Sequence, residues 1–182
     1  MDHDTVDRAF PELAAIEDEH LREGVREAWT RAMADTGVED LGAVPWFPPV
    51  QRRLDLPDAT LVDHVRDVTA GALALAEALV ERGYDLSLDT VLAGALVHDV
   101  SKLYEFDGMA DTEIERLLGH PHYGVAVVDR AGLPVEMAHI VLSHTSRTTV
   151  DPATLAASVV KLADEAAAAA LRLRAVDDLR DA

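Results

Sequence analysis

Apolar residues recur every three to four positions along most of this chain, the spacing that places them on one face of an α-helix. The pattern predicts helices over residues 11–35, 60–82, 88–101, 112–118, 120–131, 134–143 and 152–174. Capping boxes open two of them, because Thr60 precedes Asp63 and Thr112 precedes Glu115 by three residues. Aromatic residues, which favour strands, make up only 4% of the chain. The sequence therefore predicts an all-α fold.

Residues 37–58 interrupt the helical pattern and form a connector. Trp46 and Phe47 are too apolar for a free linker, so we expect the connector to cover the domain and one side of its site. We expect one domain overall, made of an N-terminal helix with a covering loop (residues 1–59) and a helical core (residues 60–182). Glycine and proline break the regular period at Gly42, Pro45, Pro48, Pro49 and Pro57.

Composition limits the compartment and the chemistry. The sequence has no cysteine, which excludes disulfide bonds and thiolate metal sites. It starts with the acidic stretch Met1-Asp2-His3-Asp4, unlike a secretion signal, and its longest apolar runs are too short to span a bilayer. We expect a cytoplasmic protein that has no membrane partner.

The chain carries a net charge of −18, because 34 acidic residues face 16 basic ones. An acidic surface repels the phosphates of nucleic acids, so general nucleic-acid binding is disfavoured. Such a surface suits a salt-loving source, and it equally suits an acidic protein from a GC-rich genome. The sequence leaves both open. Lys102 and Lys161 are its only lysines, which makes each of them more informative.

The candidate chemistry lies where the apolar run Val91–Val97 leads directly into the pair His98-Asp99. Buried polar groups are costly unless something satisfies them, and a metal ion does so. Imidazole suits transition metals, and a carboxylate can bridge two ions. Lys102 lies on the same side of a helix as the pair. Histidine or aspartate recurs near other predicted helices, at spacings that suit a bundle returning to one cavity: His64, His120, His144 and Asp164.

Two of these residues also have ordinary explanations that the sequence leaves open. His64 fits a satisfied core histidine, and Asp164 fits an ion pair with Lys161 or an arginine. Gly124, in the predicted helix over residues 120–131, indicates that another group approaches its backbone closely. Glu105 and Asp107 follow the His-Asp pair closely enough to line the same cavity.

As an ordered set, these motifs resemble the HD-domain superfamily of metal-dependent phosphohydrolases. The matching stretches lie within residues 60–170 and are Leu-Val-Asp-His64-Val, Leu-Val-His98-Asp99-Val-Ser-Lys102, His120-Pro-His-Tyr-Gly124, Ile-Val-Leu-Ser-His144 and Val-Val-Lys-Leu-Ala-Asp164. The resemblance implies a helical bundle around a central metal site. It implies one or two divalent transition-metal ions, with Mn, Fe, Co, Ni and Zn all open.

The resemblance also implies a role for each residue. His64, His98, Asp99 and Asp164 match the ligands that most members share. His120 and His144 match the additional ligands of two-metal members, in which Asp99 bridges the ions. Asp99 and Lys102 match the catalytic positions, and Lys102 is the best phosphate contact. Arg147 is a further candidate for substrate binding. Weaker candidates are Arg66 and the pair Arg52-Arg53 for a cationic role and His122 for proton transfer, whereas we expect His139 to be structural.

The function implied is hydrolysis of a small phosphate ester, such as a nucleotide, a related monoester or a cyclic phosphodiester, by metal-activated water. Two alternatives stay open, a dinuclear-iron oxygenase and a metal- or ligand-binding module without turnover. The chain lacks the extended Gly-Tyr-Pro signature of the branch that degrades cyclic di-GMP, which disfavours that substrate. The Ala-rich last helix suits a homo-oligomer and equally suits close packing inside one bundle.

Overall fold

The computed structural model describes residues 3–56 and 58–181, so Pro57 of the connector and the first two residues of the acidic start lie outside the described part. The all-α prediction is confirmed. The helices are α1 (His3–Ala9), α2 (Glu19–Thr36), α3 (Pro48–Leu54), α4 (Leu61–Glu81), α5 (Leu88–Val97), α6 (Lys102–Glu105), α7 (Glu113–Leu117), α8 (Gly119–Arg130), α9 (Val135–Ser143) and α10 (Leu155–Arg172). Short 3₁₀ turns are η1 (Pro11–Ala15), η2 (Leu41–Ala43) and η3 (Leu179–Asp181).

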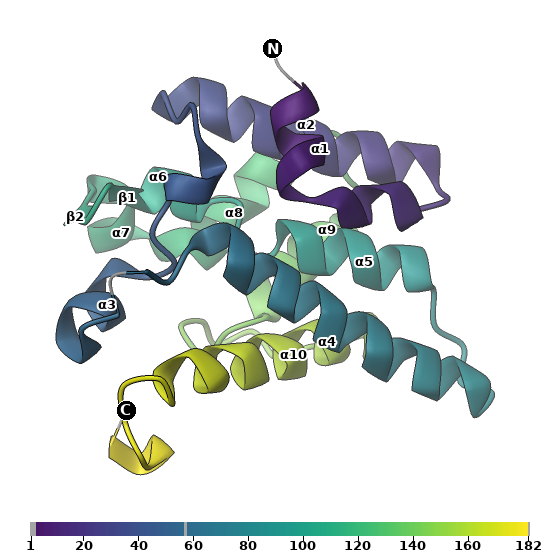
Figure 1. Cartoon of the computed structure of the whole chain (residues 1–182). Coiled ribbons are helices and arrows are strands. Elements are labelled where there is room, and N and C mark those ends of the chain that lie inside the picture. The colour runs from purple at the N-terminus through teal and green to yellow at the C-terminus, as the bar shows by residue number, and fades with distance from the viewer. Residues whose placement is uncertain (1–2, 57, 182) are drawn as a thin grey trace.

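Helix α5 lies at the centre of the bundle. Helices α4 and α10 run side by side, α5 packs against both, and α1 and α2 lie on the opposite side (Figure 1). Every residue of Val91–Val97 is buried, because this apolar run is enclosed by neighbouring helices. Trp29 of α2 is fully buried against it, and its indole Nε1 donates to the Leu96 carbonyl at 2.8 Å. The segment that carries His98 and Asp99 is therefore held from several directions.

Local capping chemistry sets several helix starts, as predicted for Thr60 and Thr112. The Thr60 hydroxyl accepts from the Asp63 amide, and Ser87 accepts from the Thr90 amide. Thr112 likewise accepts from the amides of Ile114 and Glu115. Each side chain satisfies an amide that the first helical turn leaves without a partner.

The predicted helix over residues 11–35 is wrong at its start. Residues 11–15 form η1, and α2 begins only at Glu19, where Asp18 accepts from the Leu21 amide. The Asp89 carboxylate accepts from the amides of Glu17 and Asp18 at 3.0 and 2.8 Å, which stabilises the break. Helix α1 was not predicted.

Other predicted boundaries also shift. The predicted helix over residues 88–101 ends at Val97, and a turn then leads into α6. A two-stranded hairpin, β1 (Phe106–Asp107) with β2 (Ala110–Asp111), lies between the predicted helices over residues 88–101 and 112–118, where neither helix nor strand was predicted. Helix α8 begins at Gly119, so His120 lies inside its first turn. Helix α10 begins at Leu155 instead of residue 152, and its cap is Thr154, which accepts from the Ala157 amide.

The connector contains a helix that was not predicted, because its prolines indicated a break in regular structure. Pro48 and Pro49 open α3, where proline is favourable because first-turn amides have no helical partner. The buried Gln51 side chain ties the segment together, accepting from the Phe47 amide and donating to the carbonyls of Leu56 and Ala59. The connector packs on the end of α10 through a second small apolar cluster of Trp46, Val50, Leu56, Ala59, Ala168 and Leu171. Within the described residues, no helix is both long and apolar enough to cross a membrane.

Candidate metal centre

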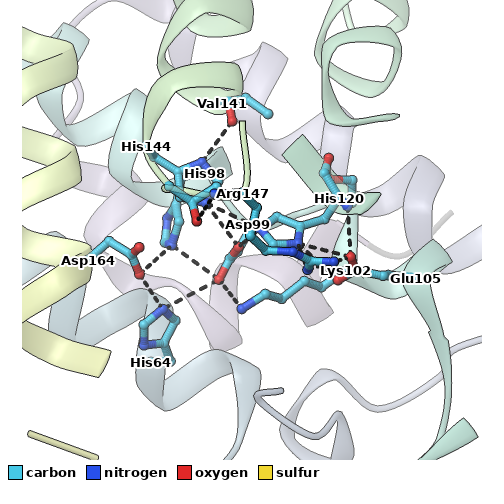
Figure 2. A network of polar contacts seen from close by, with 12 residues as sticks. His64, His98, Asp99, Lys102, Glu105, His120, Val141, His144, Arg147 and Asp164 are labelled. Carbon is cyan, nitrogen blue, oxygen red and sulfur yellow. Dashed lines mark hydrogen bonds and ion pairs between the residues drawn. The ribbon is translucent and has the colours of Figure 1, made fainter. Parts of the chain in front are cut away.

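The structure brings all the predicted ligand residues to one buried point (Figure 2). His64 lies in the first turns of α4, and His98 and Asp99 directly follow α5. His120 lies at the start of α8, His144 directly after α9, and Asp164 in the middle of α10. These six side chains come from five separate segments, and each segment is anchored in the shared core. Asp99 is only 1% exposed.

Asp99 presents one carboxylate oxygen to each of two pairs of histidines. Its Oδ2 lies 3.4 Å from His64 Nε2 and 3.3 Å from His98 Nε2. Its Oδ1 lies 3.3 Å from His120 Nε2 and 3.5 Å from His144 Nε2. Asp164 Oδ1 joins the first pair, 3.0 Å from His64 Nε2 and 3.8 Å from His98 Nε2.

The side chains therefore form two groups that share Asp99. One group is His64, His98, Asp99 and Asp164, and the other is Asp99, His120 and His144. Within each group the ligand atoms lie within 4.8 Å of one another, so each group could hold a metal ion. A shared carboxylate between two imidazole sets is the arrangement that bridges two ions.

The backbone and one carboxylate orient three of the histidines in the same way. His98 Nδ1 lies 2.7 Å from the Ala95 carbonyl, and His144 Nδ1 lies 2.7 Å from the Val141 carbonyl. His120 Nδ1 lies 2.9 Å from Glu105 Oε2. A carbonyl or carboxylate only accepts, so each Nδ1 carries the proton and each Nε2 keeps a free lone pair. These lone pairs face the cluster, as metal coordination requires.

The buried polar atoms of the centre fit a cation. Within residues 3–56 and 58–181, His98 Nε2 and both oxygens of Asp99 are buried without a hydrogen bond of acceptable geometry. His120 Nε2 and His144 Nε2 lie 3.3 Å apart, although their protonated Nδ1 atoms make both of them acceptors. Two lone pairs at that distance repel unless a positive charge lies beside them. The residues present therefore suit a transition-metal ion in both groups.

The protonation states agree with this donor set. Burial lowers the pKa of His120 well below its usual value, which keeps the imidazole neutral. Burial raises the pKa of Asp99, but the Lys102 ammonium beside it is the largest of the opposing influences, and the net pKa lies well below its usual value. Burial also raises the pKa of Asp164, whereas its hydrogen bond with His64 lowers it, and the net pKa of Asp164 is likewise below its usual value. Both carboxylates are therefore ionised at neutral pH, the form that binds metals.

A cavity of about 180 Å³ opens onto the centre. Trp46 and Phe47 of the connector form part of its wall, together with Thr145 and Ser146 after α9. Three cationic side chains also line it: Lys102, Arg147 and Arg172. The Lys102 ammonium lies 2.6 Å from Asp99 Oδ2 and is almost fully buried. Anions that reach the cavity therefore meet three cationic side chains and the candidate metal ligands.

Arg147 is held by two carboxylates that sequence reasoning did not connect to it. Its Nη1 donates to Glu105 Oε1 at 2.8 Å, and its Nη2 donates to both carboxylate oxygens of Glu115 at 2.9 and 2.8 Å. Glu105 is fully buried and accepts from the His120 amide as well as from the His120 ring. The sequence placed Glu105 near the cavity, but gave no sign of its two partners because both are distant along the chain.

Glu105 fixes the orientation of His120, so its charge is expected to matter for the second ion. The variant Glu105→Gln should weaken binding at the His120–His144 group by about 10- to 100-fold and leave the other group nearly unchanged. Competition with a chromogenic chelator measures both affinities. Glu115→Gln is the matched control, because Glu115 contacts Arg147 and no ligand histidine. Equal affinities in wild type and Glu105→Gln would contradict this role.

The remaining sequence candidates lie away from the centre. Asp107 is exposed on the hairpin, and His122 is exposed with Nδ1 on the Leu118 carbonyl. His139 Nε2 accepts from the Ala153 amide, which is a structural contact. Arg66 pairs with Glu12 at the surface. Arg52 contacts the hairpin through the Met109 carbonyl and Asp111.

Within the residues that the structure describes, Asp164 forms no ion pair with Lys161 or an arginine. Lys161 pairs instead with Glu165 at 3.3 Å, one turn along α10. The Asp164 carboxylate faces His64 and His98 across the bundle, as its contacts at 3.0 and 3.8 Å show. His64 is likewise no isolated core histidine, because its Nε2 contacts both candidate carboxylates.

The fold and the centre together define an all-α protein with a buried histidine–aspartate cluster at the point where its core helices meet. The family model of the HD domain matches residues 61–169, and the chain therefore belongs to the HD-domain family. This confirms the resemblance to the HD-domain superfamily that the sequence motifs indicated.

The chain is also similar to a curated protein. It is the dihydroneopterin 2′,3′-cyclic phosphate phosphodiesterase of Methanocaldococcus jannaschii, 31% identical over 166 residues. The match covers 83% of this chain and 64% of the relative, so the chain spans just under two thirds of the relative's length. No solved structure matches the chain.

Proposed function

We propose that this protein is a metal-dependent phosphoric ester hydrolase that acts on a small phosphodiester or phosphomonoester. The observation that carries the proposal is the position of Asp99, with each carboxylate oxygen facing a separate pair of histidines beneath an open cavity. Bound divalent ions supply a Lewis acid for the phosphoryl oxygens and a water of lowered pKa. The ligands we propose are His64, His98, Asp99, His120, His144 and Asp164.

The side chains around the cavity divide the remaining work. An ammonium group has three N–H donors, so Lys102 can hold Asp99 and a phosphoryl oxygen at the same time. Arg147 lies at the cavity wall with its charge shared between Glu105 and Glu115. Trp46 and Phe47 cover one side of the cavity and limit the access of bulk water. Lower water content strengthens every charge interaction with the substrate.

The substrate class we favour is a cyclic phosphodiester. The similar protein of M. jannaschii bears the name of a phosphodiesterase for a 2′,3′-cyclic phosphate, which supports ester hydrolysis over oxygen chemistry and over a module without turnover. A cavity of about 180 Å³ has room for a phosphoryl group and the ring that carries it. The rest of a larger substrate would then contact the rim, where Phe47 and the connector lie.

The test is hydrolysis by the metal-loaded protein. Purification without chelator, followed by addition of Mn²⁺, Co²⁺, Zn²⁺ or anaerobic Fe²⁺, gives defined metal states. Each is assayed on 2′,3′-cyclic nucleotides, bis(p-nitrophenyl) phosphate and p-nitrophenyl phosphate. We expect turnover of at least one diester that stops on chelation. A protein that binds metal but turns over none of these esters would contradict the proposal.

A further inference from the structure

The cations at the cavity differ in how far their charge is already neutralised. Lys102 contacts the Asp99 carboxylate at 2.6 Å, and Arg147 contacts the carboxylates of Glu105 and Glu115 at 2.8 Å each. Carboxylates of the protein itself therefore neutralise most of the positive charge of both side chains. A substrate anion would have to share these donors with buried carboxylates.

Arg172 is different, although it lines the same cavity. It lies in the last turn of α10, two turns beyond Asp164. In the part of the chain that the structure describes, its guanidinium forms no ion pair within 4.0 Å and no hydrogen bond. Its one specific contact is with the ring of Trp46, 5.6 Å from the guanidinium carbon to the ring centre.

Of the three cations that line the cavity in the described part of the chain, Arg172 is the one without a carboxylate partner. The C-terminal end of a helix favours a cation, but that preference leaves the N–H edge of the guanidinium unused. The edge remains available to a ligand.

Trp46 holds this guanidinium in place. The indole is 2% exposed, and its ring packs 5.3 Å from the ring of His64, so it cannot move freely. A guanidinium over an aromatic face gains cation–π attraction while its planar edge still donates hydrogen bonds. The site therefore presents a guanidinium of restricted orientation beside the candidate metal ligands.

We propose that Arg172 is the residue that binds the non-bridging oxygens of the substrate's phosphoryl group. The planar fork of arginine suits two phosphate oxygens, and charge-assisted hydrogen bonds of this kind are strong. Arg147, by contrast, serves to anchor Glu105 and the connector, where its guanidinium lies over the Phe47 ring at 5.5 Å. The inference rests on the proposed function, and it names the residue that recognises the anion in that same site.

The first test measures binding without turnover. Inorganic phosphate is titrated calorimetrically into the metal-loaded wild type, Arg172→Gln, Arg172→Lys and the control Arg174→Gln. Arg174 is exposed just past the end of the same helix and does not line the cavity. We expect Arg172→Gln to weaken phosphate binding by about 10- to 100-fold, Arg172→Lys to weaken it less, and Arg174→Gln to match wild type. Metal content and thermal unfolding should be equal in all four proteins.

The second test uses whichever ester the wild type hydrolyses. Arg172→Gln should raise KM about tenfold or more while kcat changes less, because the contact is present before the reaction begins. Phosphate affinity in Arg172→Gln equal to that of wild type would overturn the inference even if hydrolysis is found. An Arg172-dependent loss of phosphate binding in a protein without hydrolytic activity would support the inference and contradict the proposed function. A metal-loaded wild type that binds no phosphate would overturn the inference outright.

Discussion

Asp99→Ala is expected to remove both metal ions and all hydrolytic activity. Among the described residues, Asp99 is the one side chain common to both candidate ligand groups, and its two oxygens face separate histidine pairs at 3.3 to 3.5 Å. Its loss takes a candidate ligand from both groups at once and leaves the Lys102 ammonium buried without its partner. Elemental analysis of protein purified in air-free buffer without chelator should show about two ions per chain in the wild type and almost none in the variant.

Two further variants separate metal loss from unfolding. Asp99→Asn keeps the volume of the side chain but not its charge, so it should also lose metal while retaining the circular dichroism of the wild type. Asp107→Ala changes a nearby exposed carboxylate and should keep both ions and full activity. About two ions retained in folded Asp99→Ala would contradict the bridging role. About one ion in the wild type would assign His120 and His144 to the substrate side of the centre.

The helices whose starts are set by neighbouring residues could be predicted from the sequence. Thr60, Ser87 and Thr112 each accept an amide two or three residues further on, so a short stretch contains all the information. The ligand cluster could be predicted for a different reason. Histidine and aspartate within apolar helical stretches need a partner, and the HD-domain resemblance indicated which of them meet.

Features that depend on contacts across the chain could not be predicted. The break before α2 depends on Asp89, which lies 71 and 72 residues from the amides it accepts. Helix α3 depends on Gln51 and on packing against α10, whereas its prolines alone suggested a loop. The different roles of Arg147 and Arg172 follow from which carboxylates lie nearby in space. Those carboxylates are 42 and 32 residues away from Arg147, a separation that no local pattern records.

Gly124 packs against two residues that support the candidate metal centre, so a substitution here tests both the packing of the bundle and the candidate ligands. The predicted close approach is confirmed: a Cβ atom here would lie 2.4 Å from Val141 Cγ1 and 2.8 Å from Ser101 Oγ. Each of these residues supports a candidate ligand of the second group. The Val141 carbonyl holds His144 at 2.7 Å, and the Ser101 hydroxyl donates to the His120 carbonyl at 2.7 Å. A displaced neighbour on either side would therefore move a ligand.

Gly124→Ala is expected to destabilise the fold by about 2 kcal/mol, because the stiff, buried Val141 side chain has little room to yield. It should also weaken the His120–His144 ion more than the ion held by His64, His98 and Asp164. Gly71→Ala is the matched control, since its Cβ would meet only the Ala163 Cβ at an ordinary 3.7 Å in the exposed middle of α4. The control should gain up to about 1 kcal/mol from helix propensity. Urea unfolding with chelator measures packing alone, and metal titration measures the ligands. Equal stability and equal metal affinity in the two variants would show that this close contact supports neither the fold nor the second group.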